Sequence, residues 1–351
     1  MKIGILTFHR AHNYGAVLQC YALQSTLKSM GHEAYVIDYR QPHLERHYSV
    51  LNWQTLVTNA IHFHPRNVLK IIKSIRRNKK RQKLFADFLD KNIQLTERCQ
   101  QHTIPTTFDV YVIGSDQLWS KHCLGGRWDP VYLGQFPHNN TSRIISYAIS
   151  SNDSSVEELL REKTQELATF HHISMRESKY ADIISRRLSK DITVDIDPVL
   201  LASPDSWQPL LNKAFEGKHF VAQCLYREWR VHKPAIDSFV GKHNLETVSL
   251  TGNNLPVPDF VSSIYFADCV LSTSFHTIVF AIIFHKPFVY LRLNDGQDER
   301  CENLLSLVGL NDLTYESGEI NIERDIDWES VDKKLQTLRN KSINNLNNYI
   351  K

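Results

Sequence analysis

The sequence has few of the features that mark a secreted, membrane-spanning or cysteine-metal protein. Its six cysteines lie scattered over 351 residues without a Cys-x-x-Cys pair, which argues against a disulfide framework and a cysteine-bound metal. The longest apolar run, 278–284, is far too short to cross a bilayer. Residues 3–6 form a strand-like run instead of the charged and apolar regions of a signal peptide. We therefore expect a cytoplasmic protein.

Charge of one sign is also lacking. The net charge is +3, so the overall composition gives no reason to expect a polyanionic partner. Apolar residues make up 42% of the chain and charged residues 23%, which is typical of a globular protein. A chain of 351 residues is longer than one hydrophobic core usually organises, so the sequence predicts two domains.

Short runs rich in β-branched residues alternate with longer helical patterns, which predicts α/β units on parallel sheets. The expected strands are 2–8, 33–39, 109–115, 144–149, 172–176, 192–197, 220–226, 246–250, 269–272 and 288–293. A stretch rich in proline and serine, 202–217, interrupts this rhythm. We expect one domain over 1–201, a second over 202–327, and a helix at 328–351 that packs back on the body.

One segment is strongly basic. Residues 66–83 contain nine lysines and arginines and no acidic residue. Apolar side chains at helical spacing predict an amphipathic helix with a solvated basic face, inserted into the first domain near 62–92. Such a face could meet an anionic membrane surface. A nucleic-acid partner is not expected, because the helix lacks interleaved exposed aromatic residues.

In parallel α/β sheets, ligands bind beyond the carboxyl ends of the strands. After the first expected strand, Asn13 and Gly15 lie where a helix begins, a position that suits an anion but also suits a plain turn, and the segment lacks Gly-x-Gly-x-x-Gly. After the third, Ser115 and Asp116 could bind sugar hydroxyls, or one of them could cap a helix.

Two later strands are also followed by candidate residues. Arg176 offers a planar fork for a carboxylate or phosphate, although on the residues alone a structural pair with Glu177 is slightly favoured. His276 falls in the first turn of an apolar helix after Ser274, a good capping residue. That place suits proton transfer, but taken alone a single histidine there is more often a packed side chain.

Nothing in the sequence points to a metal. Asp195 and Asp197 fit the Asp-x-Asp pattern of sugar transferases, yet 192–198 reads as a buried strand that ends at Pro198. The histidines at 62, 64, 171 and 172 lack the spacing of a metal site. We expect neither a metal nor a cofactor.

Taken together, these segments resemble the polysaccharide pyruvyl transferase family from residue 2 to about residue 310. The resemblance rests on ordered motifs at 13–23, 109–119, 146–148, 174–177, 197–201 and 274–288. It implies two Rossmann-like domains that face each other across a cleft, as in GT-B glycosyltransferases. It also implies transfer of pyruvate from phosphoenolpyruvate to a sugar as a ketal, with release of phosphate, in exopolysaccharide or capsule biosynthesis.

The resemblance assigns roles to particular residues. The family's histidine falls on His276 and its basic strand-end residue on Arg176, and Asp116 is the third catalytic candidate. Donor-binding candidates are Arg176, Ser274, His276, Thr277, Arg292, Arg300 and Gly15, and acceptor-binding candidates are Asn13, Ser115 and Asp116. The family pattern has glycine where this chain has Thr277, which can occupy a first helical turn without strain. A lipid-linked acceptor would give the basic helix a purpose, because that helix would hold the enzyme at an anionic membrane surface.

Two other functions fit the same fold. A nucleotide-sugar glycosyltransferase would share the two-domain architecture, and a non-catalytic member would bind glycans through a degenerate pocket. A pyruvyl transferase depends on phosphoenolpyruvate, which distinguishes it from the glycosyltransferase. Loss of activity on replacing His276 or Arg176 would distinguish it from the non-catalytic member.

Overall fold

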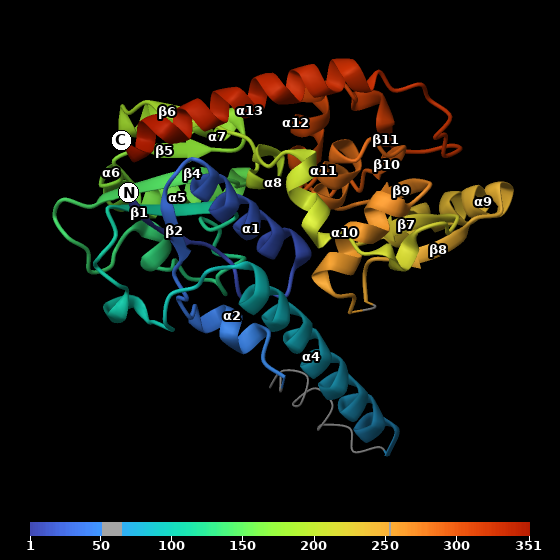
Figure 1. The fold of residues 1–351 in the computed structure, drawn as a ribbon, viewed down its shortest axis with the longest axis horizontal. Coiled ribbons are helices and arrows are strands. Elements are labelled where there is room, and N and C mark those ends of the chain that lie inside the picture. Colours follow the sequence, from blue (N-terminus) through green and yellow to red (C-terminus); the bar gives the residue numbers. More distant parts are fainter. Residues whose placement is uncertain (51–64, 253) are drawn as a thin grey trace. The chain divides into compact units, whose positions relative to one another are not determined.

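The computed structural model describes residues 1–50, 65–252 and 254–351, with the side chains of 65–70 excepted. The chain forms two compact units, one of residues 1–198 together with 345–351 and one of residues 199–344. The domain boundary expected from the sequence lies between residues 201 and 202, and the boundary between the two compact units lies between residues 198 and 199. Both units are built on parallel sheets (Figure 1), which confirms the predicted α/β class.

The first unit holds a six-stranded sheet in the order β2-β1-β3-β4-β5-β6. Its strands are β1 (Lys2–Leu6), β2 (Glu33–Val36), β3 (Val110–Asp116), β4 (Arg143–Ile149), β5 (Ile173–Met175) and β6 (Ile192–Val194). Every neighbouring pair is parallel. The strand order reverses between β1 and β3, and ligands of such sheets bind beyond the carboxyl ends at this reversal.

Helices connect these strands. They are α1 (Tyr14–Ser29), α2 (Pro42–His47), α4 (Pro65–Asn92), α5 (Asp153–Glu162), α6 (Thr164–Ala168) and α7 (Ser178–Leu188), with short 3₁₀ turns η1 (Gln101–Thr103) and η2 (Val131–Leu133). The basic segment is helical as predicted, and α4 runs outward from the sheet (Figure 1). The expected insertion begins near 62, and residues 62–64, with two of the histidines considered above, lie outside the described residues.

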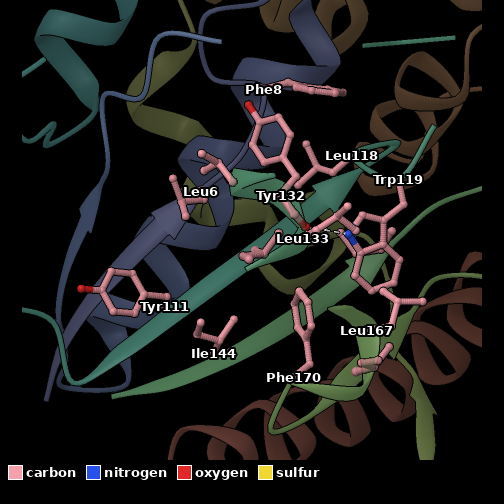
Figure 2. Close-up of a cluster of buried hydrophobic side chains, with 14 of the residues drawn as sticks. Leu6, Phe8, Tyr111, Leu118, Trp119, Tyr132, Leu133, Ile144, Leu167 and Phe170 are labelled. Atoms are coloured by element: carbon pink, nitrogen blue, oxygen red, sulfur yellow. Dashed lines mark hydrogen bonds between the residues drawn. The ribbon is translucent and has the colours of Figure 1, made fainter. Parts of the chain in front are cut away.

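A buried aromatic cluster anchors the segment that follows β3 (Figure 2). The Trp119 indole donates a hydrogen bond to the Tyr132 carbonyl at 2.8 Å, and its ring meets Phe170 edge to face at 5.6 Å between centroids. Leu118 and Trp119 are fully buried. Because these side chains fill the core, the preceding residues at the carboxyl end of β3 are held in place.

The second unit holds a five-stranded parallel sheet in the order β11-β10-β9-β7-β8. Its strands are β7 (Phe220–Cys224), β8 (Glu246–Ser249), β9 (Cys269–Ser272), β10 (Phe288–Leu291) and β11 (Thr314–Tyr315). Numbered within the unit, this is the order 2-1-3-4-5 that the first five strands of the other unit also follow. The reversal here lies between β7 and β9.

The helical segments that surround this sheet are α8 (Pro198–Leu201), η3 (Pro204–Leu210), η4 (Lys213–Phe215), η5 (Trp229–His232), α9 (Lys233–His243), α10 (Val257–Phe266), α11 (Phe275–Ile283), α12 (Glu299–Val308), η6 (Asn311–Leu313) and α13 (Trp328–Ile350). In the part of the chain that the structure describes, none of the helices combines the length and apolarity needed to span a bilayer.

The C-terminal helix α13 begins in the second unit and ends in the first. In the second unit, Arg339 Nε donates to the Leu200 carbonyl at 2.9 Å. In the first, Asn345 Nδ2 donates to Asp195 Oδ1 at 2.8 Å, and the Tyr349 ring stacks on His172 with 3.4 Å between centroids. The tail therefore makes specific contacts along its length.

Candidate functional site

Ser115 lies at the reversal of the first sheet and connects several elements inside the protein. It is fully buried. Its hydroxyl donates to the Ala148 carbonyl and accepts from the Arg176 guanidinium, each at 2.6 Å. Its backbone N–H donates to Gln19 Oε1 at 3.2 Å, and Gln19 Nε2 in turn donates to Thr7 Oγ1 at 2.7 Å. Ser115 is therefore part of a buried hydrogen-bond network that joins β1, β3, β4 and β5.

Asp116, the next residue, is partly exposed and has an unusual backbone. Its φ is 83°, in the left-handed region that glycine favours. No helix begins at 115–116 in the described chain, so helix capping does not explain this carboxylate. Gly114 is confined too, because a Cβ there would lie 2.2 Å from the Tyr147 carbonyl oxygen. Such local strain is concentrated at functional sites in proteins, which makes Asp116 a strong candidate.

Arg176 follows β5 and forms a buried ion pair with Asp197, which follows the neighbouring β6. The N···O distance is 2.8 Å, and the side chains are 5% and 0% exposed. Glu177 accepts a hydrogen bond from Ser150 Oγ at 2.8 Å. Glu177 lies after Arg176 in the chain, whereas Asp197 lies beside it across the sheet.

Both carboxylates of the Asp-x-Asp motif therefore make contacts inside the protein. Asp197 holds Arg176, and Asp195 accepts hydrogen bonds from Ser174 Oγ at 2.6 Å and Asn345 Nδ2 at 2.8 Å. No group of three or more histidine, cysteine or acidic side chains suited to a metal occurs among the residues that the structure describes.

At the start of α1, Asn13 is exposed and caps the helix, because its Oδ1 accepts a hydrogen bond from the Ala16 N–H at 3.3 Å. Gly15 is buried in the first helical turn. The segment thus has the form of an ordinary capped turn, and it lies directly after β1 at the reversal of the sheet.

The sequence reasoning missed a charged cluster around Asp38. The Arg10 Nε and Nη2 donate to both oxygens of this carboxylate at 2.9 and 2.7 Å, His9 Nε2 lies 3.0 Å from it, and Arg40 Nη2 lies 3.1 Å from it. Burial acts to raise the pKa of Asp38, but the hydrogen bonds from His9 and Arg10 outweigh it and hold that pKa well below its usual value. His9 and Arg10 directly follow the predicted strand 2–8, and that position was the available signal, whereas Asp38 lies within the predicted strand 33–39 and follows only the shorter β2 of the structure.

In the second unit, His276 is the second residue of α11, directly after β9. It is 8% exposed, and every residue of α11 is buried. Ser274 stands at the N-cap position, but its side chain makes no capping hydrogen bond to the helix. The backbone N–H of Ser274 donates to Ser272 Oγ at 2.9 Å. Thr277 is fully buried, with its hydroxyl near the Cys224 thiol, so its side chain faces the protein interior.

The two arginines expected near this turn differ in their surroundings. The guanidinium carbon of Arg300 lies 5.9 Å from the centre of the Phe275 ring, beside His276. Arg292 lies after β10 and contacts two carboxylates, Glu302 at 2.6 Å and Glu316 at 2.5 Å. The structure thus brings Arg300 to the His276 turn and ties Arg292 to acidic partners.

Arg227 was also missed by the sequence reasoning, although it directly follows the predicted strand 220–226. Its Nη2 donates to the Thr273 carbonyl and to Asp298 Oδ1, each at 3.2 Å, and its Nη1 pairs with Asp295. The Tyr226 N–H donates to Thr273 Oγ1 at 2.8 Å. These contacts join the carboxyl ends of β7 and β9 and fix the turn that leads to His276.

Most predicted site residues therefore lie after strands at the reversals of the two sheets. Asn13, Gly15, Ser115 and Asp116 surround the β1–β3 reversal, with Arg176 joined to them through Ser115. Ser274, His276 and Thr277 follow β9 at the other reversal, with Arg300 beside them. Among these residues, His276 is a candidate acid–base group, the arginines are candidates for binding an anion, and Asn13 and Asp116 are candidates for binding hydroxyls.

Comparison with solved structures gives distant likenesses. A UDP-GlcNAc 2-epimerase from Methanocaldococcus jannaschii is 10% identical with a TM-score of 0.47, over 97% of this chain and 93% of that one. The UDP-GlcNAc 2-epimerase from Neisseria meningitidis bound to UDP-GlcNAc is 10% identical with a TM-score of 0.43, over 98% and 94%. A glycosyltransferase of Streptomyces sp. SF2575 is 13% identical with a TM-score of 0.40, over 97% and 95%.

The sequence itself gives the family. No curated protein matches it. The model of the polysaccharide pyruvyl transferase family matches residues 13–295, which include the carboxyl ends of β3, β5 and β9 with Asp116, Arg176 and His276. The chain belongs to the polysaccharide pyruvyl transferase family, and it is an enzyme of that class.

Proposed function

We propose that this enzyme transfers pyruvate from phosphoenolpyruvate to a sugar of a polysaccharide precursor, forms a cyclic ketal and releases phosphate. The observation that carries the proposal is the position of His276. It lies in the first turn of α11, directly after β9 and beside Arg300, within the span of the family match. A proton-transfer group next to an anion-binding group is what an enol phosphate donor requires.

Phosphoenolpyruvate carries a carboxylate and a phosphate. The first turn of α11 offers the backbone N–H groups and the positive dipole end that bind such anions. Arg300 adds a guanidinium at that turn. Thr277 contributes through its backbone, because its side chain is buried near Cys224. Arg176 is the proposed second arginine for the donor, and Asp197 fixes the orientation of its guanidinium.

The proposed reaction balances with two hydroxyl groups of one sugar. His276 delivers a proton to the methylene carbon of the donor, and the resulting cationic centre is attacked by the first hydroxyl, which loses its proton. Cleavage of the carbon–oxygen bond to phosphate then lets the second hydroxyl attack. The two hydroxyl protons end on the new methyl group and on the released phosphate. Both proton transfers need an acid–base group within hydrogen-bond reach, the role proposed for His276.

The acceptor side of the proposal uses the first unit. Asp116 and Asn13, both accessible at the carboxyl edge of the sheet, would orient sugar hydroxyls. We propose that the acceptor is lipid-linked, as in exopolysaccharide or capsule biosynthesis. The basic face of α4 supports this, since Lys73, Arg76 and Lys80 are exposed and each such charge near an anionic bilayer contributes about 1 kcal/mol of attraction.

A donor-dependence assay tests the proposal. The purified chain is incubated with phosphoenolpyruvate and a panel of methyl glycosides of hexoses and N-acetylhexosamines, and phosphate release is followed together with the mass of the glycoside. Phosphate release that requires both substrates, with pyruvate added to the sugar, supports the transfer. Turnover of a nucleotide-sugar without any effect of phosphoenolpyruvate would overturn it in favour of a glycosyltransferase. Glycoside binding without any turnover would overturn it in favour of a glycan-binding protein.

A further inference from the structure

An aromatic cluster from three segments of the first unit lies at the loop between β1 and α1. The His12 ring stands 4.8 Å from the Tyr48 ring and 5.5 Å from the Phe85 ring, measured between centroids. Tyr48 follows α2, and Phe85 belongs to α4. Phe85 is buried and also packs on Tyr14, whereas His12 and Tyr48 remain partly exposed. The cluster therefore has a fixed base and an accessible surface.

Two charged residues border these rings. The Arg81 guanidinium donates a hydrogen bond to the His12 carbonyl at 2.6 Å, and its carbon lies 5.7 Å from the centre of the Phe85 ring. Asp116 stands at the carboxyl end of β3, which pairs with β1, the strand that leads into the His12 loop. Both Arg81 and Asp116 are partly exposed. Arg81 thus lies at the margin of the aromatic surface, and the Asp116 charge is near enough to act on the Tyr48 phenol.

The protonation of the aromatic residues suits a neutral ligand. Burial, together with the charges of Arg81 and other basic residues, lowers the pKa of His12 to about 4, so the ring is neutral at physiological pH. Burial raises the pKa of the Tyr48 phenol; the Arg81 charge acts against this shift, and the Asp116 charge adds to it. Both side chains therefore present an apolar ring with an uncharged polar edge.

We propose that His12, Tyr48, Asp116 and Arg81 form the subsite that holds the sugar ring of the acceptor. This inference rests on the proposed function and adds the residues that recognise its acceptor. A pyranose ring has an apolar C–H face, which packs on aromatic rings, and a rim of hydroxyls, which need donors and acceptors. The cluster offers the rings of His12 and Tyr48 for the face. It offers the Asp116 carboxylate, the Tyr48 hydroxyl and the Arg81 guanidinium for the rim.

The proposed subsite gives a reason for a carboxylate at position 116, where the backbone is left-handed. With φ at 83°, Asp116 is the last residue of β3 at the reversal of the sheet, the edge at which His12 also lies. A glycine would adopt this backbone with less strain, but it would supply no carboxylate. Sugar binding gives a reason for an acidic side chain at a position that disfavours it.

The test compares Tyr48→Ala, Tyr48→Phe and His12→Ala with wild type. Tyr35→Phe is the matched control, because Tyr35 is a phenol of β2 in the same unit whose hydroxyl donates to Glu33 at 2.6 Å. The probes are methyl glycosides of hexoses and N-acetylhexosamines, with binding followed by saturation-transfer NMR and turnover by phosphate release from phosphoenolpyruvate. We expect the KM for the glycoside to rise about tenfold in Tyr48→Ala and His12→Ala and about threefold in Tyr48→Phe. The KM for phosphoenolpyruvate should stay unchanged in all of them.

The binding and turnover measurements distinguish failure of the subsite from failure of the proposed function. Turnover by wild type with an unaltered glycoside KM in Tyr48→Ala and His12→Ala overturns the subsite and leaves the transferase function standing. Glycoside binding that both substitutions weaken, without any turnover of phosphoenolpyruvate, supports the subsite and overturns the proposed function. If no glycoside of the panel binds or is turned over by wild type, the subsite is overturned. A rise of the KM for phosphoenolpyruvate equal to that for the glycoside would also overturn it, since a general disturbance would then explain the loss.

Discussion

The Arg176 guanidinium lies 2.8 Å from the carboxylate of Asp197, and both side chains are almost completely buried at the ends of neighbouring strands. A buried charge without its partner is strongly unfavourable, so this pair belongs to the architecture of the sheet as well as to the candidate site. Loss of activity on replacing Arg176 is therefore informative only when the stability of the variant is measured beside it.

Replacement of Arg176 by alanine should lower the free energy of unfolding by about 3–5 kcal/mol, because Asp197 would remain buried without its cation. Urea denaturation measures the change. Arg187→Ala is the matched control, since Arg187 is exposed on α7 and its loss should cost less than about 0.5 kcal/mol. Equal effects of the two substitutions would show that the buried pair does not matter for stability. For the donor-binding role, Arg176→Lys keeps the positive charge but removes the planar fork, so it should raise the KM for phosphoenolpyruvate in a folded protein.

Asp116→Gly should separate stability from activity. Glycine relieves the left-handed backbone at φ 83°, so the free energy of unfolding should be unchanged or up to about 1 kcal/mol higher, while the catalytic rate falls because the carboxylate is lost. Asp116→Asn is the control that keeps the size and tolerates the same backbone. A glycine variant that is both less stable and fully active would contradict the account on both counts.

The stability of the first unit should depend on pH through His172. Burial lowers the pKa of His172 to about 4, although the Asp195 and Asp191 charges act to raise it. Because the unfolded state then binds a proton more readily than the folded state, the His172 contribution is complete above pH 6.5 and is lost as the pH falls towards 4. We expect the unfolding free energy of wild type to fall more steeply over this range than that of His172→Gln. The exposed His219→Gln should follow wild type, and parallel curves for wild type and His172→Gln would refute the assignment.

The basic face of α4 should bind anionic membranes. Reversal of Lys73, Arg76 and Lys80 to glutamate should weaken binding to phosphatidylserine-containing vesicles at least about hundredfold, at about 1 kcal/mol for each charge removed. Added salt should weaken wild-type binding as well. Glutamate at Lys213, Lys218 and Lys341, exposed positions elsewhere, gives the same change in net charge. If both triple variants lose binding equally in a sedimentation assay, α4 is not the docking surface.

The ten strands expected from the sequence all occur, because alternating strand and helix patterns are local and long enough to recognise. The eleventh, β11, consists of Thr314 and Tyr315, which is too short to show any period. Strand β6 ends at Val194, shorter than the expected 192–197, although the Asp195 N–H still donates to the Met175 carbonyl of β5 at 2.9 Å.

Positions directly after strands could be predicted, but the partners of charged side chains could not. Arg176 was expected at a strand end, yet its pairing with Asp197 follows from β6 lying beside β5, which requires the strand order. The same applies to Asp38, whose partner Arg10 lies 28 residues away in the chain. The interior role of Ser115 likewise depends on β4 and β5 packing beside β3.

The central claim, that His276 moves protons in pyruvyl transfer, is tested most directly by the rate of phosphate release from phosphoenolpyruvate in the presence of a glycoside acceptor. The account predicts release by wild type that requires both substrates. It also predicts a kcat about 10²–10⁴-fold lower in a folded His276→Ala variant, with the exposed His219→Ala unchanged. Release by folded His276→Ala at the wild-type rate would contradict the claim.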